Sequence, residues 1–288
     1  MFISLHIQRV MKKYLTNLAS RAYSWVAVLW IHLCVGCRFW CWRTQLWLIQ
    51  LHLIESTFTG MKQTLLFIRH GQTTWNVEQK LPGQLPGVAL NEKGREQAAL
   101  LADALSAIPI SAIISSPLER AYETAQIIGQ GRDLSIQAEP DLMDTNVGRW
   151  AGENYEQLSK NDPEWKAYVQ DPTVAPEGIE TFPQVQQRAL AAVERWRTRE
   201  DVGAYPAFVA HADVVKLIIA HYTGLEAKRA GTLFIDNASV SLVEIDTENI
   251  HSVRVVAVGW SPRPGWLRPA ILDKQKDDVP VQEGEQKT

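Results

Sequence analysis

Short apolar runs recur along the chain from residue 61 onward, at lengths typical of buried strands. Each early run is followed by a polar or glycine-containing segment and then by a stretch with helical spacing. Two later stretches are rich in β-branched residues, which favour extended structure. The sequence therefore predicts strands over Thr64–Arg69, Ala112–Ser115, Ala207–Ala210, Val240–Ile245 and Val253–Val258.

Between these runs, apolar residues recur at the spacing of the buried face of a helix. Ser116, Pro117 and Glu119 form the pattern of a helix start, with a serine cap, a proline at the first position and a glutamate that closes a capping box. Thr181 can cap the longest helix, and Gly224 can end the last one. The expected helices are Glu92–Ile108, Ser116 to about Ile128, Thr181–Arg199 and Asp213–Tyr222.

This alternation of strands and helices indicates a mostly parallel sheet that is covered on both faces. We therefore expect an α/β fold, a three-layer sandwich with a mostly parallel central sheet and helices on both faces. In open sheets of this kind, ligands bind beyond the carboxyl ends of the strands.

Residues 1–60 differ in class from the rest of the chain. They carry six of the 29 Lys and Arg residues, one of the 32 acidic residues and five of the eleven Trp residues. The uncharged run Ala22–Cys37 is sixteen residues long, whereas a membrane-spanning helix needs roughly 20. Two interpretations stay open: a dispensable start that is not native to the protein, or a segment that contacts a membrane as an anchor or targeting signal.

All three cysteines, Cys34, Cys37 and Cys41, lie in this extension, and without a second pair of ligands they make a poor zinc site. The rest of the chain has no cysteine and hence no disulfide, which fits a reducing compartment, so we expect a cytoplasmic protein. The tail at 269–288 is rich in Lys, Asp, Glu and Gln, which predicts disorder. A net charge of -3 gives no reason to expect a nucleic-acid partner.

Two histidines and two arginines lie where the expected strands end. His70 directly follows the first apolar run and His211 follows the third, so both imidazoles are expected at the same edge of the sheet. Arg69 adjoins His70, and Arg120 lies in the first turn of the helix after the second run. Each residue alone is compatible with a purely structural role. Together they predict an anion site suited to phosphate.

The segments around these residues read FIRHGQTTWN at 67–76, SSPLERAYETA at 115–125, LMDTNVGRWAG at 142–152, PEGIE at 176–180 and VAHADV at 209–214. In this order they resemble the motifs of the histidine phosphatase superfamily, also called phosphoglycerate-mutase-like. One Arg-His-Gly triplet is a weak signal, whereas ordered motifs across nearly all of 61–260 are a strong one. The resemblance implies a histidine phosphatase domain over residues 61–268, similar to bacterial phosphatase and phosphomutase branches.

The resemblance implies that His70 is the nucleophile, which attacks phosphorus as a neutral imidazole and becomes a phosphohistidine. Arg69, Arg120 and His211 would hold the phosphoryl oxygens and stabilise charge in the transition state. No metal or other cofactor is expected, because these side chains take the electrostatic role of a metal. The residues expected to bind the substrate are Arg69, Gly71, Asn76, Arg120 and His211.

A leaving oxygen needs a proton, which the family usually supplies from a Glu. Asp144 occupies that position here, one methylene shorter, and a phosphate dianion facing it should raise the pKa of its carboxyl. Glu153 is the alternative acid, and a turn role for Asp144 is the structural alternative. The Gly that commonly follows the second histidine is Ala212 here, and the neighbouring Asp213 could orient His211 or repel very acidic substrates.

The compact spacing between Asp144 and His211 favours a phosphatase, because family mutases carry a longer insert there that helps to close the site. We therefore expect a metal-independent phosphomonoester hydrolase that acts on a small phosphorylated metabolite. A phosphoglycerate mutase-type phosphomutase and a non-catalytic phosphate-binding module are the alternatives, and the oligomeric state stays open. Four aromatic residues indicate either an apolar or ring-bearing leaving group or ordinary helix packing: Tyr155, Trp165, Tyr168 and Phe182.

Overall fold

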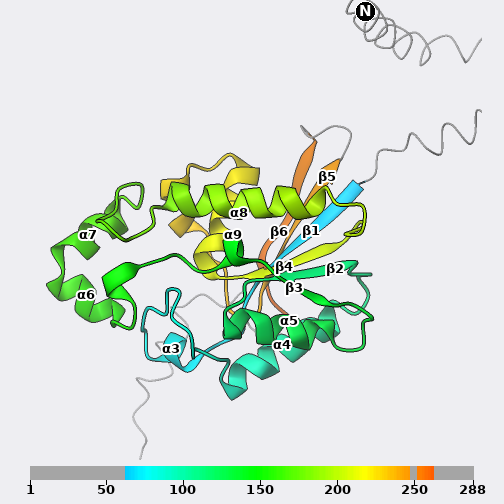
Figure 1. The fold of residues 1–288 in the computed structure, drawn as a ribbon, viewed down its shortest axis with the longest axis horizontal. Coiled ribbons are helices and arrows are strands. Elements are labelled where there is room, and N and C mark those ends of the chain that lie inside the picture. Colours follow the sequence, from blue (N-terminus) through cyan, green and yellow to red (C-terminus); the bar gives the residue numbers. More distant parts are fainter. Residues whose placement is uncertain (1–61, 247–251, 263–288) are drawn as a thin grey trace, which may run out of the picture. The chain divides into compact units, whose positions relative to one another are not determined.

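The computed structural model describes residues 62–246 and 252–262 (Figure 1). The predictions for the extension at 1–60, its three cysteines and the tail at 269–288 lie outside these residues. Within the described part of the chain, none of the helices has the length and apolar character that crossing a membrane requires.

Six strands of the described residues form one mixed sheet in the order β3-β2-β4-β1-β5-β6. The first four strands in this order run parallel to one another, and β5 and β6 run antiparallel at one edge. Every strand that the apolar runs predicted is present. Strand β3 was missed, because it is three residues long and mostly exposed. The strands are β1 (Lys62–Arg69), β2 (Ala112–Ser115), β3 (Ile136–Ala138), β4 (Pro206–Ala210), β5 (Val240–Asp246) and β6 (Val253–Trp260).

Four long helices cover the two faces of this sheet. Figure 1 shows α8 and α9 on one face and α4 and α5 on the other, with α6 and α7 on a lobe beside the sheet. The long helices are α4 (Glu92–Ala104), α5 (Glu119–Gly129), α8 (Phe182–Arg197) and α9 (Ala212–Thr223), and the shorter elements are α3 (Thr74–Val77), α6 (Tyr155–Asn161), α7 (Pro163–Gln170), η1 (Pro140–Leu142), η2 (Gly148–Trp150) and η3 (Ala227–Thr232).

Successive residues of β1 pack into two separate hydrophobic cores. Leu65 and Phe67 pack into the core on the α8 and α9 face. Leu66 and Ile68 pack into the core on the α4 and α5 face. Because side chains alternate across a strand, a run that is apolar at every position can fill both cores. The expectation of a three-layer α/β sandwich is confirmed.

The predicted start of the helix after β2 is wrong. Helix α5 begins at Glu119, and its cap residue Leu118 makes no side-chain capping bond. The hydroxyl of Ser116 is instead buried at the sheet edge, and the carboxylate of Glu119 accepts from the backbone N–H of Gly87 at 2.9 Å. In contrast, the prediction for Thr181 is confirmed, since its side chain and that of Gln184 form a capping box for α8.

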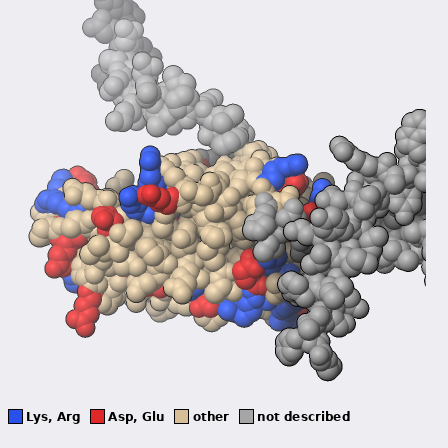
Figure 2. Space-filling view, turned by 90° about the horizontal axis from the view of Figure 1, so that it is seen from above, with Lys and Arg blue, Asp and Glu red and all other residues tan. Residues whose placement is uncertain are grey.

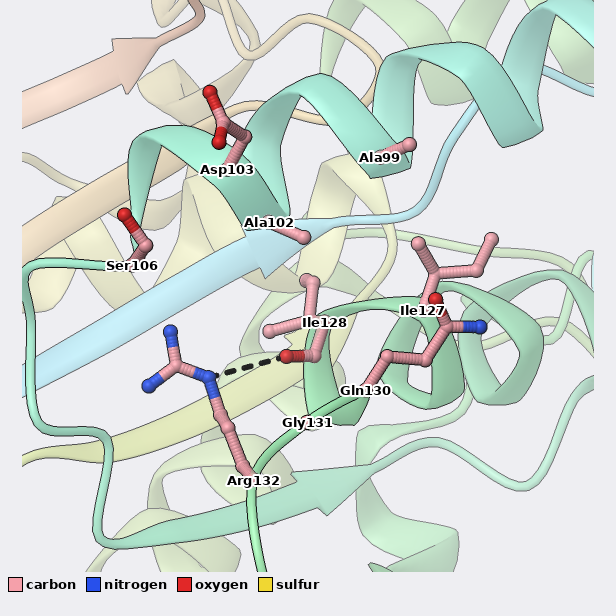
Figure 3. Close-up of a pocket in the computed structure, with 9 residues that line it drawn as sticks. All are labelled: Ala99, Ala102, Asp103, Ser106, Ile127, Ile128, Gln130, Gly131 and Arg132. Atoms are coloured by element: carbon pink, nitrogen blue, oxygen red, sulfur yellow. Dashed lines mark hydrogen bonds between the residues drawn. The ribbon is translucent and has the colours of Figure 1, made fainter.

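The helix expected to reach Ile108 ends earlier, at Ala104. Arg132 takes the place of a further helical turn. Its guanidinium donates to the carbonyls of Ile108 at 2.9 Å and Leu105 at 2.8 Å, and to that of Ile128 at 3.2 Å. The carbonyl groups beyond α4 are therefore satisfied by a side chain rather than by the helix itself. Arg132 is also one of the residues that line a pocket between the ends of α4 and α5 (Figure 3).

Charged side chains on the face shown in Figure 2 stand in mixed groups of both signs. The lobe formed by α6 and α7 is an example, where Arg149 pairs with Asp162 and Glu164, and Lys160 pairs with Glu156. Exposed pairs of this kind contribute little to stability, about 0–1 kcal/mol each. They leave this face without a large field of one sign.

Candidate active site

The pairing of β1 with β4 brings the two predicted histidines together. The strands are parallel neighbours, with Arg69 opposite Ala210, so the residue that follows each strand lies at the same edge. The backbone N–H of His70 donates to the carbonyl of Ala210 at 3.0 Å. The two imidazole rings of His70 and His211 lie 5.2 Å apart between centroids. Sheet topology alone therefore creates the juxtaposition that the sequence indicated.

His70 is held in one tautomer. Its Nδ1 lies 2.7 Å from the carbonyl oxygen of Gly71, and because a carbonyl can only accept, Nδ1 carries the proton. Nε2 therefore keeps its lone pair. Burial, and then the charges of Arg120 and Arg69, hold the pKa of His70 well below its ordinary value, while the Gly71 carbonyl acts in the opposite direction. The ring is neutral and suited to nucleophilic attack through Nε2.

The loop that carries His70 is packed too tightly for side chains at two positions. A Cβ atom at Gly71 would lie 2.4 Å from the carbonyl oxygen of Gly94, in the first turn of α4. A Cβ atom at Gly94 would lie 2.0 Å from the carbonyl oxygen of Gln72. The Gly71 backbone N–H also donates to the hydroxyl of Thr124 in α5, at 3.1 Å. The loop that carries His70 is thus fixed against both α4 and α5.

Arg120 is fully buried and Arg69 is half-buried, and both cations have unused donors. Arg69 donates through Nη1 to the carbonyl of Ile235 at 2.7 Å, and Arg120 donates through Nη2 to the carbonyl of Gly83 at 2.8 Å. Nε of Arg69, and Nε and Nη1 of Arg120, are buried and find no hydrogen-bond partner among the described residues. Buried unpaired donors are costly, so this cluster favours an anion that supplies acceptors.

His211 makes a contact that sequence reasoning missed. Its Nε2 lies 2.9 Å from the hydroxyl oxygen of Ser116, which also accepts from the backbone N–H of Leu118 at 3.3 Å. When Ser116 donates its proton to Nε2, Nδ1 of His211 becomes the N–H that can meet an anion. Burial and then the charge of Arg120 hold the pKa of His211 well below its ordinary value. The pattern around Ser116 signalled a helix cap, which concealed this contact.

Asp144 lies beside the guanidinium of Arg120 and the imidazole of His211. Its Oδ2 is 2.9 Å from Nη2 of Arg120 and 3.7 Å from Nδ1 of His211, and its Oδ1 accepts from the backbone N–H of Thr145 at 3.0 Å. Burial raises the pKa of Asp144, although the charge of Arg120 acts in the opposite direction. The alternative acid, Glu153, lines a different cavity.

The side-chain amide of Asn76 is held in one orientation at the site. Its Oδ1 accepts from the backbone N–H of Thr73 at 3.0 Å and from Nδ2 of Asn237 at 3.3 Å. Asn237 also donates to the backbone carbonyl of His70 at 3.2 Å. Because the amide oxygen is engaged twice, the amide nitrogen is the group that Asn76 can offer to a ligand. Asn237 lies in the segment that precedes β5, where no sequence motif marked it.

Of the predicted site residues, Arg69, His70, Asn76 and Asp144 line a cavity of about 200 Å³, whereas Gly71, Arg120 and His211 are not among its lining residues. Of the four aromatic residues singled out in the sequence, Tyr155 lines it, whereas Trp165, Tyr168 and Phe182 are buried in an aromatic cluster with Trp150. Core packing therefore accounts for three of these four aromatic residues. The lining comprises Arg69, His70, Asn76, Leu81, Pro82, Gly83, Asp144, Thr145, Val147, Tyr155, Ala212, Asp213 and Lys216.

Asp213 and Lys216 are two of these lining residues. Their side chains pair at 3.3 Å across one turn of α9. The contact to the His211 ring at hydrogen-bond distance comes from Ser116 instead. No cluster of three or more His, Cys, Asp or Glu side chains suited to a metal ion occurs within residues 62–246 and 252–262.

Residues 65–257, more than half of the chain, match the sequence profile of the histidine phosphatase superfamily (branch 1). The chain belongs to this superfamily. The resemblance drawn from the five motifs is therefore confirmed, and the mixed, mostly parallel sheet agrees with the solved structures of histidine phosphatases.

Two curated relatives of this chain carry different descriptions. Bifunctional protein Rv2228c of Mycobacterium tuberculosis is 33% identical over 208 residues, which make up 69% of this chain and 56% of that protein. The chain thus spans little more than half the length of that relative. The probable phosphoglycerate mutase GpmB of Escherichia coli is 32% identical over 180 residues, 62% of this chain and 82% of that protein.

A solved phosphatase resembles the chain in three dimensions. The mycobacterial glucosyl-3-phosphoglycerate phosphatase Rv2419c, in complex with VO3, has a TM-score of 0.58 and 31% identity, and covers 63% of this chain and 92% of its own. The same phosphatase has also been solved with inorganic phosphate. VO3 and phosphate are both oxyanions, whose oxygens accept hydrogen bonds.

Proposed function

We propose that this histidine phosphatase hydrolyses phosphomonoesters of small metabolites, without a metal, through a phosphohistidine at His70. The observation that carries the proposal is the tautomer of His70. The Gly71 carbonyl accepts from Nδ1–H at 2.7 Å, so the lone pair of Nε2 is available near the guanidinium groups of Arg69 and Arg120. A neutral nucleophile next to two cations suits a dianionic phosphoryl group.

In the first step, Nε2 of His70 forms a bond to phosphorus and the bond from phosphorus to the ester oxygen breaks. Asp144 donates its proton to the departing oxygen, so the alcohol leaves neutral. The imidazole, now substituted at Nε2 and protonated at Nδ1, is positively charged. The Gly71 carbonyl stabilises that charge through the hydrogen bond already in place.

In the second step, water attacks phosphorus and the bond from phosphorus to Nε2 breaks. The carboxylate of Asp144 takes the proton of the water, which returns Asp144 to its acid form and His70 to its neutral form. Throughout both steps, Arg69, Arg120 and His211 bind the phosphoryl oxygens and offset the charge that develops on them.

Asp144 is the proposed acid because its protonation is coupled to the substrate. Its carboxylate pairs with Arg120 at 2.9 Å. A bound phosphoryl dianion competes for the donors of Arg120 and adds negative charge nearby, and both effects raise the pKa of Asp144. The acid is thus protonated when a leaving group needs the proton.

We expect the leaving group to contact Tyr155, Asp213 and Lys216, which line the cavity. The volume of about 200 Å³ suits a small metabolite. We also propose a cytoplasmic location, since this activity acts on soluble metabolites.

A phosphomutase is the second candidate, because GpmB, a probable phosphoglycerate mutase, is 32% identical over 180 residues. A mutase keeps the phosphohistidine and returns the phosphoryl group to an acceptor alcohol, whereas a phosphatase passes it to water. The two activities therefore differ in the second step only.

The test uses the full 288-residue chain with a chelator and a panel of phosphomonoesters. We expect phosphate release that survives the chelator and disappears in His70→Ala. Transfer of phosphate to a second alcohol, with little release, would support the mutase instead. A folded chain that binds phosphate but neither releases nor transfers it would contradict both catalytic proposals and support a binding module.

A further inference from the structure

We infer that Arg188 is a positioning residue, which holds the backbone of the proposed acid Asp144 in place for proton transfer. This inference rests on the proposed function, because it assigns Asp144 the role of proton donor. Arg188 lies on α8, outside the lining of the cavity, and touches neither His70 nor His211 through any hydrogen bond within the described residues.

All five N–H groups of the Arg188 guanidinium have a hydrogen-bond acceptor, either on the backbone around Asp144 or on the side chain of Glu180. Nη1 donates to the backbone carbonyls of Asp141 and Met143, each at 2.7 Å. Nη2 donates to the backbone carbonyl of Asp144 at 2.9 Å. Nε and Nη2 also donate to the two carboxylate oxygens of Glu180, at 2.8 and 2.9 Å. Because a guanidinium presents its donors in a rigid planar fork, these five hydrogen bonds fix the groups that accept them.

Glu180 also binds the backbone that follows Asp144. Its Oε2 accepts from the backbone N–H of Asn146 at 2.8 Å, and its own backbone N–H donates to the carbonyl of Asn146 at the same distance. The segment 141–146 is therefore held on both sides of Asp144. We call Arg188 and Glu180 the acid clamp.

The position of the Asp144 carboxylate depends on its backbone. An aspartate side chain has two rotatable bonds, and here Oδ1 is also tied to the N–H of Thr145 at 3.0 Å. A shift of the backbone moves Oδ2 relative to Arg120 and to any leaving oxygen. Small displacements at a reacting centre lower rates strongly, so a residue that fixes this backbone acts on proton transfer.

A role in folding alone would make a different prediction. Loss of packing or stability lowers the activity toward every ester to a similar extent. Loss of proton transfer affects esters with poor leaving groups, because a p-nitrophenolate leaves without protonation and an alkoxide does not. The dependence on the leaving group therefore separates positioning from a general structural effect.

The experiment measures kcat/KM of the full chain and of Arg188→Lys for p-nitrophenyl phosphate and for an alkyl phosphate. Lys keeps the charge but loses the fork. We expect a loss of about threefold for the aryl ester and about 100-fold for the alkyl ester, within the range of general acid catalysis. Adding Arg188→Lys to Asp144→Asn should cause little further loss on the alkyl ester, because the acid is already absent.

Arg195→Lys is the matched control. Arg195 lies on the same helix and pairs with the side chains of Glu139 and Asp141, at 2.8 and 2.9 Å, without reaching Asp144. The Arg195→Lys substitution should leave the ratio of kcat/KM between the aryl and the alkyl ester unchanged. If Arg188→Lys fails to fold, Glu180→Gln weakens the same clamp and should show the same selective loss.

An equal loss on both esters, or no loss, would overturn the assignment of Arg188. A parent chain that releases phosphate from neither ester would contradict the proposed function itself, and this inference with it. Activity of the parent chain toward both esters therefore distinguishes failure of the clamp from failure of the phosphatase proposal.

Discussion

The guanidinium of Arg120 and the carboxylate of Asp144 are paired at 2.9 Å, with the arginine side chain fully buried and the aspartate side chain 16% exposed. One cation thus contacts the proposed proton donor while two of its nitrogens, Nε and Nη1, lack partners among the described residues. A phosphoryl group bound to those nitrogens would raise the pKa of the neighbouring Asp144 carboxyl. In the proposed mechanism, this pair couples substrate binding to the protonation of the acid.

Asp144→Asn should lower kcat/KM for alkyl phosphates by about 10²- to 10⁴-fold, because the amide cannot supply a proton. For p-nitrophenyl phosphate the loss should be much smaller. Glu153→Gln is the control and should stay within about twofold of the parent chain, since Glu153 lines another cavity. The opposite result, with Glu153→Gln selectively impaired on alkyl esters, would reassign the acid to Glu153.

Stability should fall as the pH is lowered below about 6.5, because His70 and His211 are neutral in the fold and protonate in the unfolded chain. The unfolded state then binds more protons, which costs the fold up to about 1.4 kcal/mol per pH unit for each histidine. Asp144 acts with the opposite sign, since its raised pKa makes the fold bind more protons above pH 3.8.

Urea unfolding midpoints measured from about pH 5 to 7.5 test this linkage. His70→Asn, which removes one of the two groups, should roughly halve the slope below about pH 6.5. A free energy of unfolding that stays constant over this range in the parent chain would show that the histidines are not held neutral.

Gly71→Ala should destabilise the fold by about 1–3 kcal/mol, the usual cost of overpacking, and impair catalysis as well. The added methyl would lie 2.4 Å from the backbone oxygen of Gly94, so the His70 loop or the start of α4 must move. Gly231→Ala is the control, because that Cβ meets nothing within 4 Å. Thermal unfolding and kcat of both variants provide the comparison, and equal behaviour would argue against a close-packed nucleophile loop.

Ser116→Ala should lower kcat/KM about tenfold, which corresponds to roughly 1.4 kcal/mol, by removing the partner of His211 Nε2. The exposed Ser135, which accepts from Gln137 in a solvent-facing contact, supplies a control in Ser135→Ala. Unchanged kinetics in Ser116→Ala, with the fold intact, would mean that the orientation of His211 does not depend on this hydroxyl.

Much of the fold could be predicted because the local signals agreed with the global arrangement. The apolar runs predicted the long strands, and the spacing of polar residues after them placed His70 and His211 at one sheet edge. The strand Ile136–Ala138 was not predictable, because two of its three residues are exposed and pairing with β2 alone defines it.

The contacts that tune the site were harder to predict, because they join residues far apart in sequence. Ser116 lies in a helix-cap pattern, yet tertiary packing drew its hydroxyl to His211, 95 residues away. Arg188 reaches backbone carbonyls more than 40 residues earlier, and no local pattern marks a side chain that binds main-chain oxygens. Sequence patterns report periodicity and short motifs, whereas these bonds depend on how the layers stack.

The most direct test of the phosphohistidine mechanism is rapid quenching of the full chain during turnover of p-nitrophenyl phosphate, with peptide mapping by mass spectrometry. The mechanism predicts a transient phosphoryl group on the peptide that contains His70, which is absent in His70→Ala and decays as inorganic phosphate appears. Turnover by the parent chain without phosphorylation of that peptide, or undiminished turnover by His70→Ala, would contradict it.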